Sequence, residues 1–171
     1  MPRNRTIPDQ TVLNTVRQML ASGGDKAVSF STVAQATGLA ASTLAQRYAT
    51  RDGMVRAALL DGWDRLIDVT VEAETEAPMS AKGVPALLKR IGRDGGGDLS
   101  VLVTRQTEAD LRNRAEDWRR RMESAIALRL GNDDHARDSA SMVFAAWQGR
   151  LLWGLDSDSG FRLKDAIKRL G

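Results

Sequence analysis

Apolar residues recur at helical spacing along almost the whole chain, and this pattern predicts an all-α fold. The first apolar stripe consists of Val12, Leu13, Val16, Met19 and Leu20. Thr6 is placed to cap this helix, with Pro8 and Asp9 in its first turn, and the glycine pair at 23–24 ends it. We find no segment with the alternating pattern of a strand, and no internal repeat.

Two short helices separated by a glycine follow. Ser29 can cap the first of them, whose apolar residues face inward. Gly38 can adopt the left-handed conformation that a sharp turn between two helices needs. The next helix covers about residues 41–48, with Leu44 and Tyr48 inward at the spacing i, i+4.

The fourth predicted helix begins near Arg51 and keeps one apolar face to about residue 77, where Pro78 stops it. It is long enough to belong to two domains, which we place at residues 1–60 and 61–171. The remaining apolar spacing predicts helices over about 81–92, 98–111, 113–130, 134–155 and 160–170. The segment GRDGGGDLS, residues 92–100, is predicted to be a loop, and it lacks the Lys-Ser/Thr of a phosphate-binding loop.

Charge is distributed unevenly along the 171 residues. The first 60 residues carry seven bases and three acids, whereas the remainder carries 18 bases and 19 acids. This asymmetry favours a polyanionic partner for the N-terminal third, and a weakly basic solvated surface is the alternative. No apolar run approaches the ~18 residues of a membrane span, and the N-terminus lacks the apolar segment of a secretory signal. We therefore expect no membrane partner. The chain has no cysteine, which excludes disulfides and cysteine chemistry and fits a cytoplasmic protein.

A helix, a tight turn and a second helix form a helix-turn-helix, whose second helix enters the major groove of DNA. Residues 41–47 keep bulky apolar groups off the outer face, and their Ser, Thr and Gln side chains can bond to phosphates or base edges. Arg47 can pair with guanine or a phosphate, Arg51 can meet a flanking phosphate, and Arg3 and Arg5 form a basic arm for the minor groove. The predicted DNA-binding residues are Arg3, Arg5, Ser29, Ala41, Ser42, Thr43, Gln46, Arg47, Tyr48 and Arg51.

The same segment resembles the DNA-binding domain of the TetR family of bacterial transcriptional regulators, over about residues 6–65. That family typically shows Ala-x-x-x-Gly-Val-Ser-x-Gly-Thr-Leu-Tyr-x-His/Tyr-Phe-x-Ser-Lys-Glu-x-Leu. The corresponding places here hold Ala34, Gly38, Leu39, Ala40, Ser42, Thr43, Leu44, Ala45, Arg47, Tyr48, Thr50, Arg51, Asp52 and Met54. The chain departs from the pattern at Ala40 and Ala45, where the family usually has a serine and a tyrosine that touch phosphate.

The resemblance implies a ligand-responsive regulator, in our expectation a repressor, that binds a palindromic operator on double-stranded DNA as a homodimer. The C-terminal region would bind an unknown small-molecule effector, and residues 113–130 and 134–155 would form a four-helix interface with the partner. The ligand-binding candidates are Trp63, Leu66, Leu102, Arg105, Gln106, Trp118 and Met122. The dimer-interface candidates are Met142, Ala145, Ala146, Gly149, Leu152 and Trp153, although a helix buried within one subunit is the alternative.

Two other functions compete with this one. A protein of the same fold without operator binding could serve as a carrier of lipids or small molecules, or as a protein-partner module. Ala40 and Ala45 favour that alternative, and the N-terminal arginines oppose it. An enzyme is not expected, because no catalytic arrangement can be singled out. The only histidine, His135, lies between Asp134 and Asp138, but Asn132 or Asp133 as a helix cap explains that segment better than a metal site. We therefore expect no metal and no cofactor.

Overall fold

A computed structural model of the chain describes residues 7–153, 165 and 167. The described residues form seven α helices and one 3-10 turn, with no strand among them, which confirms the all-α prediction. The chain divides into two compact units, residues 1–64 and 65–171. The division falls inside the long helix α4 (Arg51–Glu76), so this helix contributes to both units.

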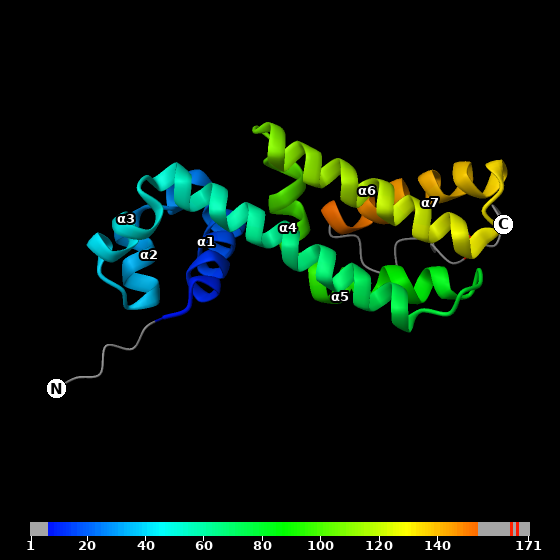
Figure 1. Cartoon of the computed structure of the whole chain (residues 1–171), viewed down its shortest axis with the longest axis horizontal. Helices are drawn as coiled ribbons and strands as arrows, with labels where there is room; N and C mark the ends of the chain where they lie inside the picture. Colours follow the sequence, from blue (N-terminus) through cyan, green and yellow to red (C-terminus); the bar gives the residue numbers. More distant parts are fainter. Residues whose placement is uncertain (1–6, 154–164, 166, 168–171) are drawn as a thin grey trace. The chain divides into compact units, whose positions relative to one another are not determined.

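The first unit contains three helices and the beginning of α4 (Figure 1). They are α1 (Asp9–Gly23), α2 (Phe30–Thr37) and α3 (Ala41–Tyr48), and the 3-10 turn η1 (Asp25–Ala27) joins α1 to α2. Their apolar side chains form a core that contains Val12, Val16, Leu20, Val33, Leu44, Met54 and Ala58. The predicted stripe of the first helix is therefore largely confirmed. Thr6 lies outside the described residues, and Pro8 precedes α1 without a side-chain cap.

One buried arginine joins α1 to α4 within this unit. Arg17 donates hydrogen bonds to the Ala58 carbonyl oxygen at 2.9 Å and to Asp61 Oδ2 at 2.6 Å. A guanidinium that is buried in a core needs such anionic and carbonyl partners, because its desolvation would otherwise be costly. Arg17 therefore adds to the positive charge of the N-terminal third without being placed on its surface.

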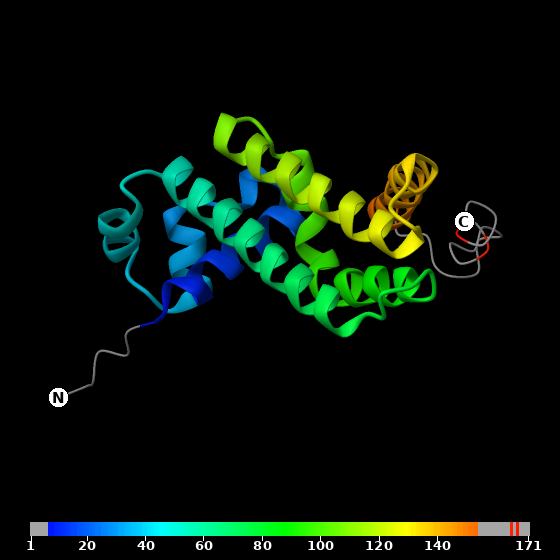
Figure 2. The ribbon, with the colours of Figure 1, turned by 45° about the vertical axis from the view of Figure 1, so that its right-hand side comes forward.

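The second unit is a bundle of the remaining part of α4 with α5 (Gly83–Thr104), α6 (Ala109–Leu130) and α7 (Asp134–Leu152). Helices α6 and α7 pack against one another, and α5 contacts both of them (Figures 1 and 2). An aromatic cluster lies in this core: the ring centroid of Trp118 is 5.7 Å from that of Phe144 and 6.4 Å from that of Trp147. The predicted helix over residues 160–170 lies largely outside the described residues.

The predicted loop at residues 92–100 is wrong, because α5 continues as one helix through this segment. Three consecutive glycines lower helix propensity by about 1 kcal/mol each. The helix nevertheless has an apolar face on both sides of them, buried at Leu87, Leu88, Ile91, Leu99 and Leu102. A Cβ atom at Gly95 would lie 2.5 Å from Leu66 Cδ1, so this glycine lets α5 approach α4 closely. Tertiary packing therefore outweighs the local preference.

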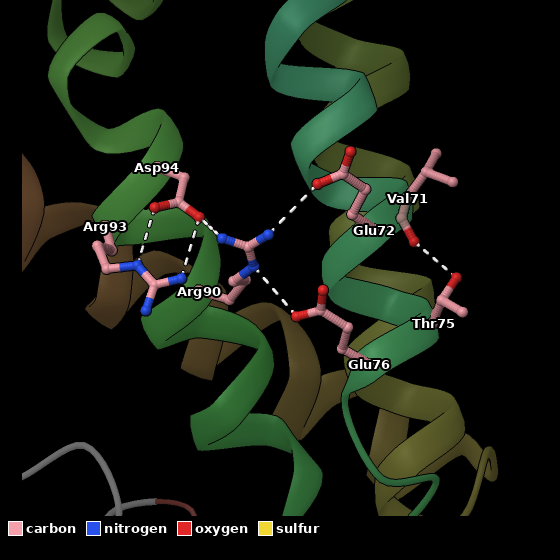
Figure 3. A network of polar contacts seen from close by, with 7 residues as sticks. All are labelled: Val71, Glu72, Thr75, Glu76, Arg90, Arg93 and Asp94. Atoms are coloured by element: carbon pink, nitrogen blue, oxygen red, sulfur yellow. Dashed lines mark hydrogen bonds and ion pairs between the residues drawn. The ribbon is translucent and has the colours of Figure 1, made fainter.

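Polar side chains also join α4 to its neighbours in the second unit. Arg90 of α5 pairs with Glu72 and Glu76 of α4 and with Asp94 of its own helix, and Figure 3 shows its guanidinium between these carboxylates. Arg129 of α6 is buried at the end of α4, where it donates to the carbonyl oxygens of Glu74 at 2.8 Å, Ala77 at 3.2 Å and Pro78 at 3.2 Å. Arg129 thus satisfies carbonyl groups that the end of a helix leaves without a helical partner.

Candidate nucleic-acid interface

A sharp turn between α2 and α3 places α3 on the surface of the first unit. Ser29 and Thr32 form a reciprocal capping box at the start of α2, with backbone-to-hydroxyl distances of 2.9 and 3.0 Å. Gly38 ends α2 in the left-handed conformation, at φ 75°, and its N–H donates to the Ala34 carbonyl at 2.9 Å. This confirms the predicted roles of Ser29 as a cap and Gly38 as the turn residue.

Helix α3 has one buried and one exposed face. Leu44 is fully buried in the core of the unit. Ala41, Ser42 and Gln46 are exposed on the outside, and Thr43 is half-buried between the two faces. The small and polar character of the exposed face is what the helix of a helix-turn-helix needs in order to approach the edges of bases in a groove.

The start of α3 has no side-chain cap. Ala40 occupies the cap position, and its carbonyl oxygen accepts from the N–H groups of Thr43 at 3.0 Å and Leu44 at 3.3 Å. A helix N-terminus carries partial positive charge and favours an anion. The alanine therefore leaves this end of α3 without the internal hydroxyl that a serine would supply.

Arg47 and Tyr48, at the end of α3, both contact Asp9 at the start of α1. Arg47 Nη1 lies 2.9 Å from Asp9 Oδ1 and also donates to the Ile7 carbonyl at 3.2 Å. The Tyr48 hydroxyl donates to the same Asp9 Oδ1 at 3.2 Å. Burial, followed by the charge of Asp9 and its hydrogen bond, raises the pKa of Tyr48 from 10.0 to about 12. Asp9 thus joins residues that are 38 and 39 positions away in the sequence.

Arg51 is held by the segment that precedes α2. Its Nε donates to the Val28 carbonyl at 3.2 Å, and its Nη2 donates to the Asp25 carbonyl at 2.7 Å. Its remaining nitrogen, Nη1, lies 2.7 Å from Asp52 Oδ1. Arg51 therefore fixes η1 against the start of α4, a structural role that we did not predict from the sequence.

The connection between α3 and α4 is unusually tight. Ala49 has a φ of 62° and a ψ of −51°, and the Thr50 N–H donates to the Tyr48 carbonyl at 2.7 Å. A positive φ is rare and strained for a residue that has a Cβ atom. A Cβ atom at Gly53 would lie 2.5 Å from the same Tyr48 carbonyl oxygen, so the first turn of α4 requires a glycine there. These restraints fix the end of α3 relative to α4.

The structure brings most of the predicted DNA-binding residues onto one short helix and its immediate surroundings. Arg3 and Arg5 lie outside the described residues. Asp9 was not predicted from the sequence as a partner of this set. Its position in the first turn of a helix was evident, but nothing local in the sequence pairs it with residues at the end of α3.

The ligand-binding candidates lie mostly in packed cores. Trp63 belongs to the first unit, and the other six belong to the second. In the second unit, Trp118 Nε1 donates to Thr70 Oγ1 at 2.9 Å, and the side chains of Leu66, Leu102 and Met122 are buried. Arg105 and Gln106 are half-buried after the end of α5, where Gln106 Nε2 donates to the Val103 carbonyl at 3.1 Å.

Two open grooves in the second unit are lined by other residues. One, of about 320 Å³, has Ala73, Ala77 and Ala86 on its walls together with Glu76, Lys89, Arg90 and Arg93. The other, of about 280 Å³, lies over α6 and α7 and includes Arg120, Glu123, Ser124, Asn132, Arg137 and Ser141. Among the described residues, no group of three His, Asp or Glu side chains is arranged to hold a metal ion. Asp133 caps α7 by accepting from the Ala136 N–H at 2.7 Å, as the sequence suggested.

The dimer-interface candidates form an exposed apolar face on α7. Met142 is 50% exposed, Leu152 is 43% exposed, and Trp153, just after the helix, is 81% exposed. Ala145 is exposed and Ala146 and Gly149 are half-buried. The opposite face of α7 is buried within the same chain, at Ala140, Val143, Phe144 and Trp147. No helix within the described residues has both the length and the apolar character needed to cross a membrane.

Solved structures of several regulators share this fold. A transcriptional regulator from Rhodococcus sp. Rha1 matches with a TM-score of 0.72 and 16% identity, over 96% of this chain and 94% of that chain. PfmR, a TetR family transcriptional regulator from Thermus thermophilus, matches with a TM-score of 0.66 and 13% identity, over 92% of this chain and 93% of that chain. FadR, a fatty acid degradation regulator from Bacillus halodurans, matches with a TM-score of 0.65 and 15% identity, over 97% of this chain and 94% of that chain. No protein-family model and no curated protein matches the sequence. The chain therefore has the fold of TetR-family regulators, which confirms the resemblance at the level of fold.

Proposed function

We propose that this protein is a cytoplasmic DNA-binding transcriptional regulator, a ligand-responsive repressor that binds a palindromic operator as a homodimer. The observation that carries the proposal is the outer face of α3, which follows a left-handed glycine turn and exposes Ala41, Ser42 and Gln46. The fold that it shares with solved regulators supports the proposal. No catalytic role is part of it.

In this proposal α3 is the recognition helix. Gln46 is assigned to a base edge, because the amide oxygen of a glutamine can accept from adenine N6 while its amide nitrogen donates to adenine N7. Ser42 and Thr43 are assigned to the phosphate backbone, together with the uncapped N-terminus of α3. Arg3 and Arg5 remain candidates for a minor-groove arm.

The homodimer is proposed to form through α7, with a contribution from α6. The large exposed residues Met142, Leu152 and Trp153 lie on the same face as the small residues Ala145 and Gly149, at spacings of three, four and seven residues. Small residues let two helices approach closely, while large residues fill the space beside them. Leu128 adds an exposed apolar side chain on α6. Two copies of α3 related by a twofold axis would read the two halves of a palindrome.

The effector is proposed to act through the second unit. Leu66, Leu102, Trp118 and Met122 are packed together with their neighbours, so a ligand that reaches them must separate side chains that are now in contact. Such a ligand would shift the equilibrium toward a geometry in which the two recognition helices no longer fit adjacent grooves. The coupling requires that the ligand bind this second geometry more tightly than the DNA-binding one.

A second candidate function is a carrier or protein-partner module of the same fold that does not bind an operator. Two observations favour it: Ala40 and Ala45 replace residues that touch phosphate in the resembling family, and Arg47 and Arg51 are both held by carboxylates of the same chain. The exposed polar face of α3 favours the regulator instead, because a carrier has no need of it.

Selection of bound sequences from a random duplex library separates the two functions. The regulator is expected to enrich a palindrome, and its binding to the selected duplex should weaken steeply as the salt concentration rises. A carrier or partner module would enrich no sequence, and any weak binding would disappear near physiological salt.

A further inference from the structure

The contact between Asp9 and Arg47 lies beside the proposed recognition surface, and it is accessible to solvent. The Asp9 side chain is 66% exposed and that of Arg47 is 26% exposed. Asp9 Oδ1 accepts from both Arg47 and Tyr48, so one carboxylate oxygen is surrounded by two donors from the last turn of α3. The Ile7 carbonyl adds a third contact, to the same nitrogen of Arg47.

A carboxylate and a DNA phosphate offer an arginine the same chemistry. Both present anionic oxygens that accept hydrogen bonds from the guanidinium, so the two compete for one arginine. An exposed ion pair is weak because water screens both of its charges, so removing Asp9 should change the affinity for DNA by a modest factor rather than by orders of magnitude. The carboxylate is nevertheless always present at contact distance, whereas a phosphate must first be brought there.

We propose that Asp9 is a positioning residue that holds Arg47 in place of a DNA phosphate, so that the protein makes one phosphate contact fewer on DNA of arbitrary sequence. This inference rests on the proposed function. In this inference Asp9 weakens the attraction between the protein and DNA. Its carboxylate orients Arg47 toward α1 and neutralises the positive charge of Arg47 beside α3. The protein then depends more on the outer face of α3 and less on its total positive charge.

Binding to a duplex of arbitrary sequence, measured across a salt series, tests the proposal. The variants are Asp9→Asn, Arg47→Ala and the double variant, compared with the wild-type chain. Asp9→Asn should bind several-fold more tightly, and the slope of log affinity against log salt should steepen by about 0.9, the value for one additional phosphate contact. Combined with Asp9→Asn in the double variant, Arg47→Ala should abolish the gain, because the additional phosphate contact would be made by Arg47. Asp134→Asn, which removes an exposed Asp–Arg pair from α7, is the matched control and should change neither quantity.

A gain for Asp9→Asn that is equally large without Arg47 would overturn the proposal, because removal of any nearby negative charge would then explain it. No gain at all would also overturn it. If neither the wild-type chain nor any variant binds DNA, both the proposed function and this inference fail.

Tyr48 supplies a readout that does not depend on DNA. It is the only tyrosine of the chain, so the ultraviolet absorbance of its phenolate reports on this site alone. Asp9→Asn should lower the pKa of Tyr48, because Asp9 helps to raise it, and Arg47→Ala should raise it further. Asp25→Asn is the control and should leave it unchanged. An unaltered titration in Asp9→Asn would show that the Asp9 contact does not exist in solution, independently of any DNA result.

Discussion

The Tyr48 side chain is partly buried within the first unit, and its hydroxyl donates a hydrogen bond to Asp9. Ionisation of the phenol would bring two negative charges together at 3.2 Å. The folded protein therefore binds this proton more tightly than the unfolded chain does. The raised pKa of Tyr48 therefore affects the free energy of unfolding as well as the chemistry of the site.

The free energy of unfolding should consequently depend on this proton at high pH. The contribution of Tyr48 is fully present below its unfolded pKa of 10.0 and is lost as the pH rises toward about 12. Urea unfolding at a series of pH values should show a decline in this range. In Tyr48→Phe the decline should be smaller, and identical curves for the two proteins would contradict the proposed environment of the hydroxyl.

Gly53 should be intolerant of any side chain. Its replacement by alanine places a Cβ atom 2.5 Å from the Tyr48 carbonyl oxygen, and backbone cannot move aside as a flexible side chain can. We expect Gly53→Ala to lower the free energy of unfolding by about 1–3 kcal/mol. Gly97→Ala is the matched control, because nothing lies within 4 Å of its Cβ position, and it should stabilise α5 by up to about 1 kcal/mol. Equal effects of the two substitutions on urea unfolding would count against the tight α3–α4 turn.

At the level of single residues, the sequence predicted local roles better than distant contacts. The cap at Ser29, the turn at Gly38 and the inward Leu44 follow from spacing and conformation alone. The partners of Arg47 and Arg51 could not be predicted in this way. Asp9 lies 38 positions from Arg47 and Asp25 lies 26 positions from Arg51, and only the folded chain brings each pair together. The presence of an arginine in a predicted recognition helix therefore does not show by itself that its charge is available to bind DNA.

At the level of elements, the same contrast holds for α5. A run of three glycines is a reasonable signal for a loop, and the segment 95–97 forms a helix only because its two flanks share one buried apolar face. Spacing predicted α4 and its stop at Pro78 closely, since both depend on local rules. The buried arginine at the end of α4 was not evident, because Arg129 is one of many arginines in a highly charged helix.

Arg129 should be essential to the packing of α6 against α4. Its replacement by methionine keeps much of the apolar stem but removes the side-chain donor of the Glu74 and Ala77 carbonyl groups, whereas the Pro78 carbonyl still accepts from the Ser80 N–H at 2.9 Å. Buried acceptors without a partner are costly, so we expect a loss of about 3 kcal/mol in the free energy of unfolding. Arg137→Met, at an exposed pair with Asp134, should change it by no more than about 0.5 kcal/mol. A loss for Arg129→Met as small as that of the control would contradict the capping role.

At the level of the whole molecule, the exposed apolar face of α7 should determine the oligomeric state. Ala145 is exposed in the single chain, so Ala145→Arg should not disturb the fold of a protomer. In a homodimer, two arginines would meet across a close helix contact, and light scattering after size-exclusion chromatography should show a monomer. Ala81→Arg, at an exposed position between α4 and α5 and outside the proposed interface, is the control and should remain dimeric. A wild-type monomer, or a dimer that persists in Ala145→Arg, would contradict this interface.

The central claim is that the outer face of α3 reads DNA, and parallel selections with the wild-type chain and with Gln46→Arg test it most directly. Both proteins should enrich a palindrome from a random duplex library. The Gln46→Arg palindrome should differ from that of the wild-type chain at one symmetric pair of positions and shift there toward guanine, because arginine bonds to guanine through O6 and N7. The same palindrome from both proteins would remove Gln46 from the base contacts, and no enrichment by the wild-type chain would contradict the assignment of α3 as a recognition helix.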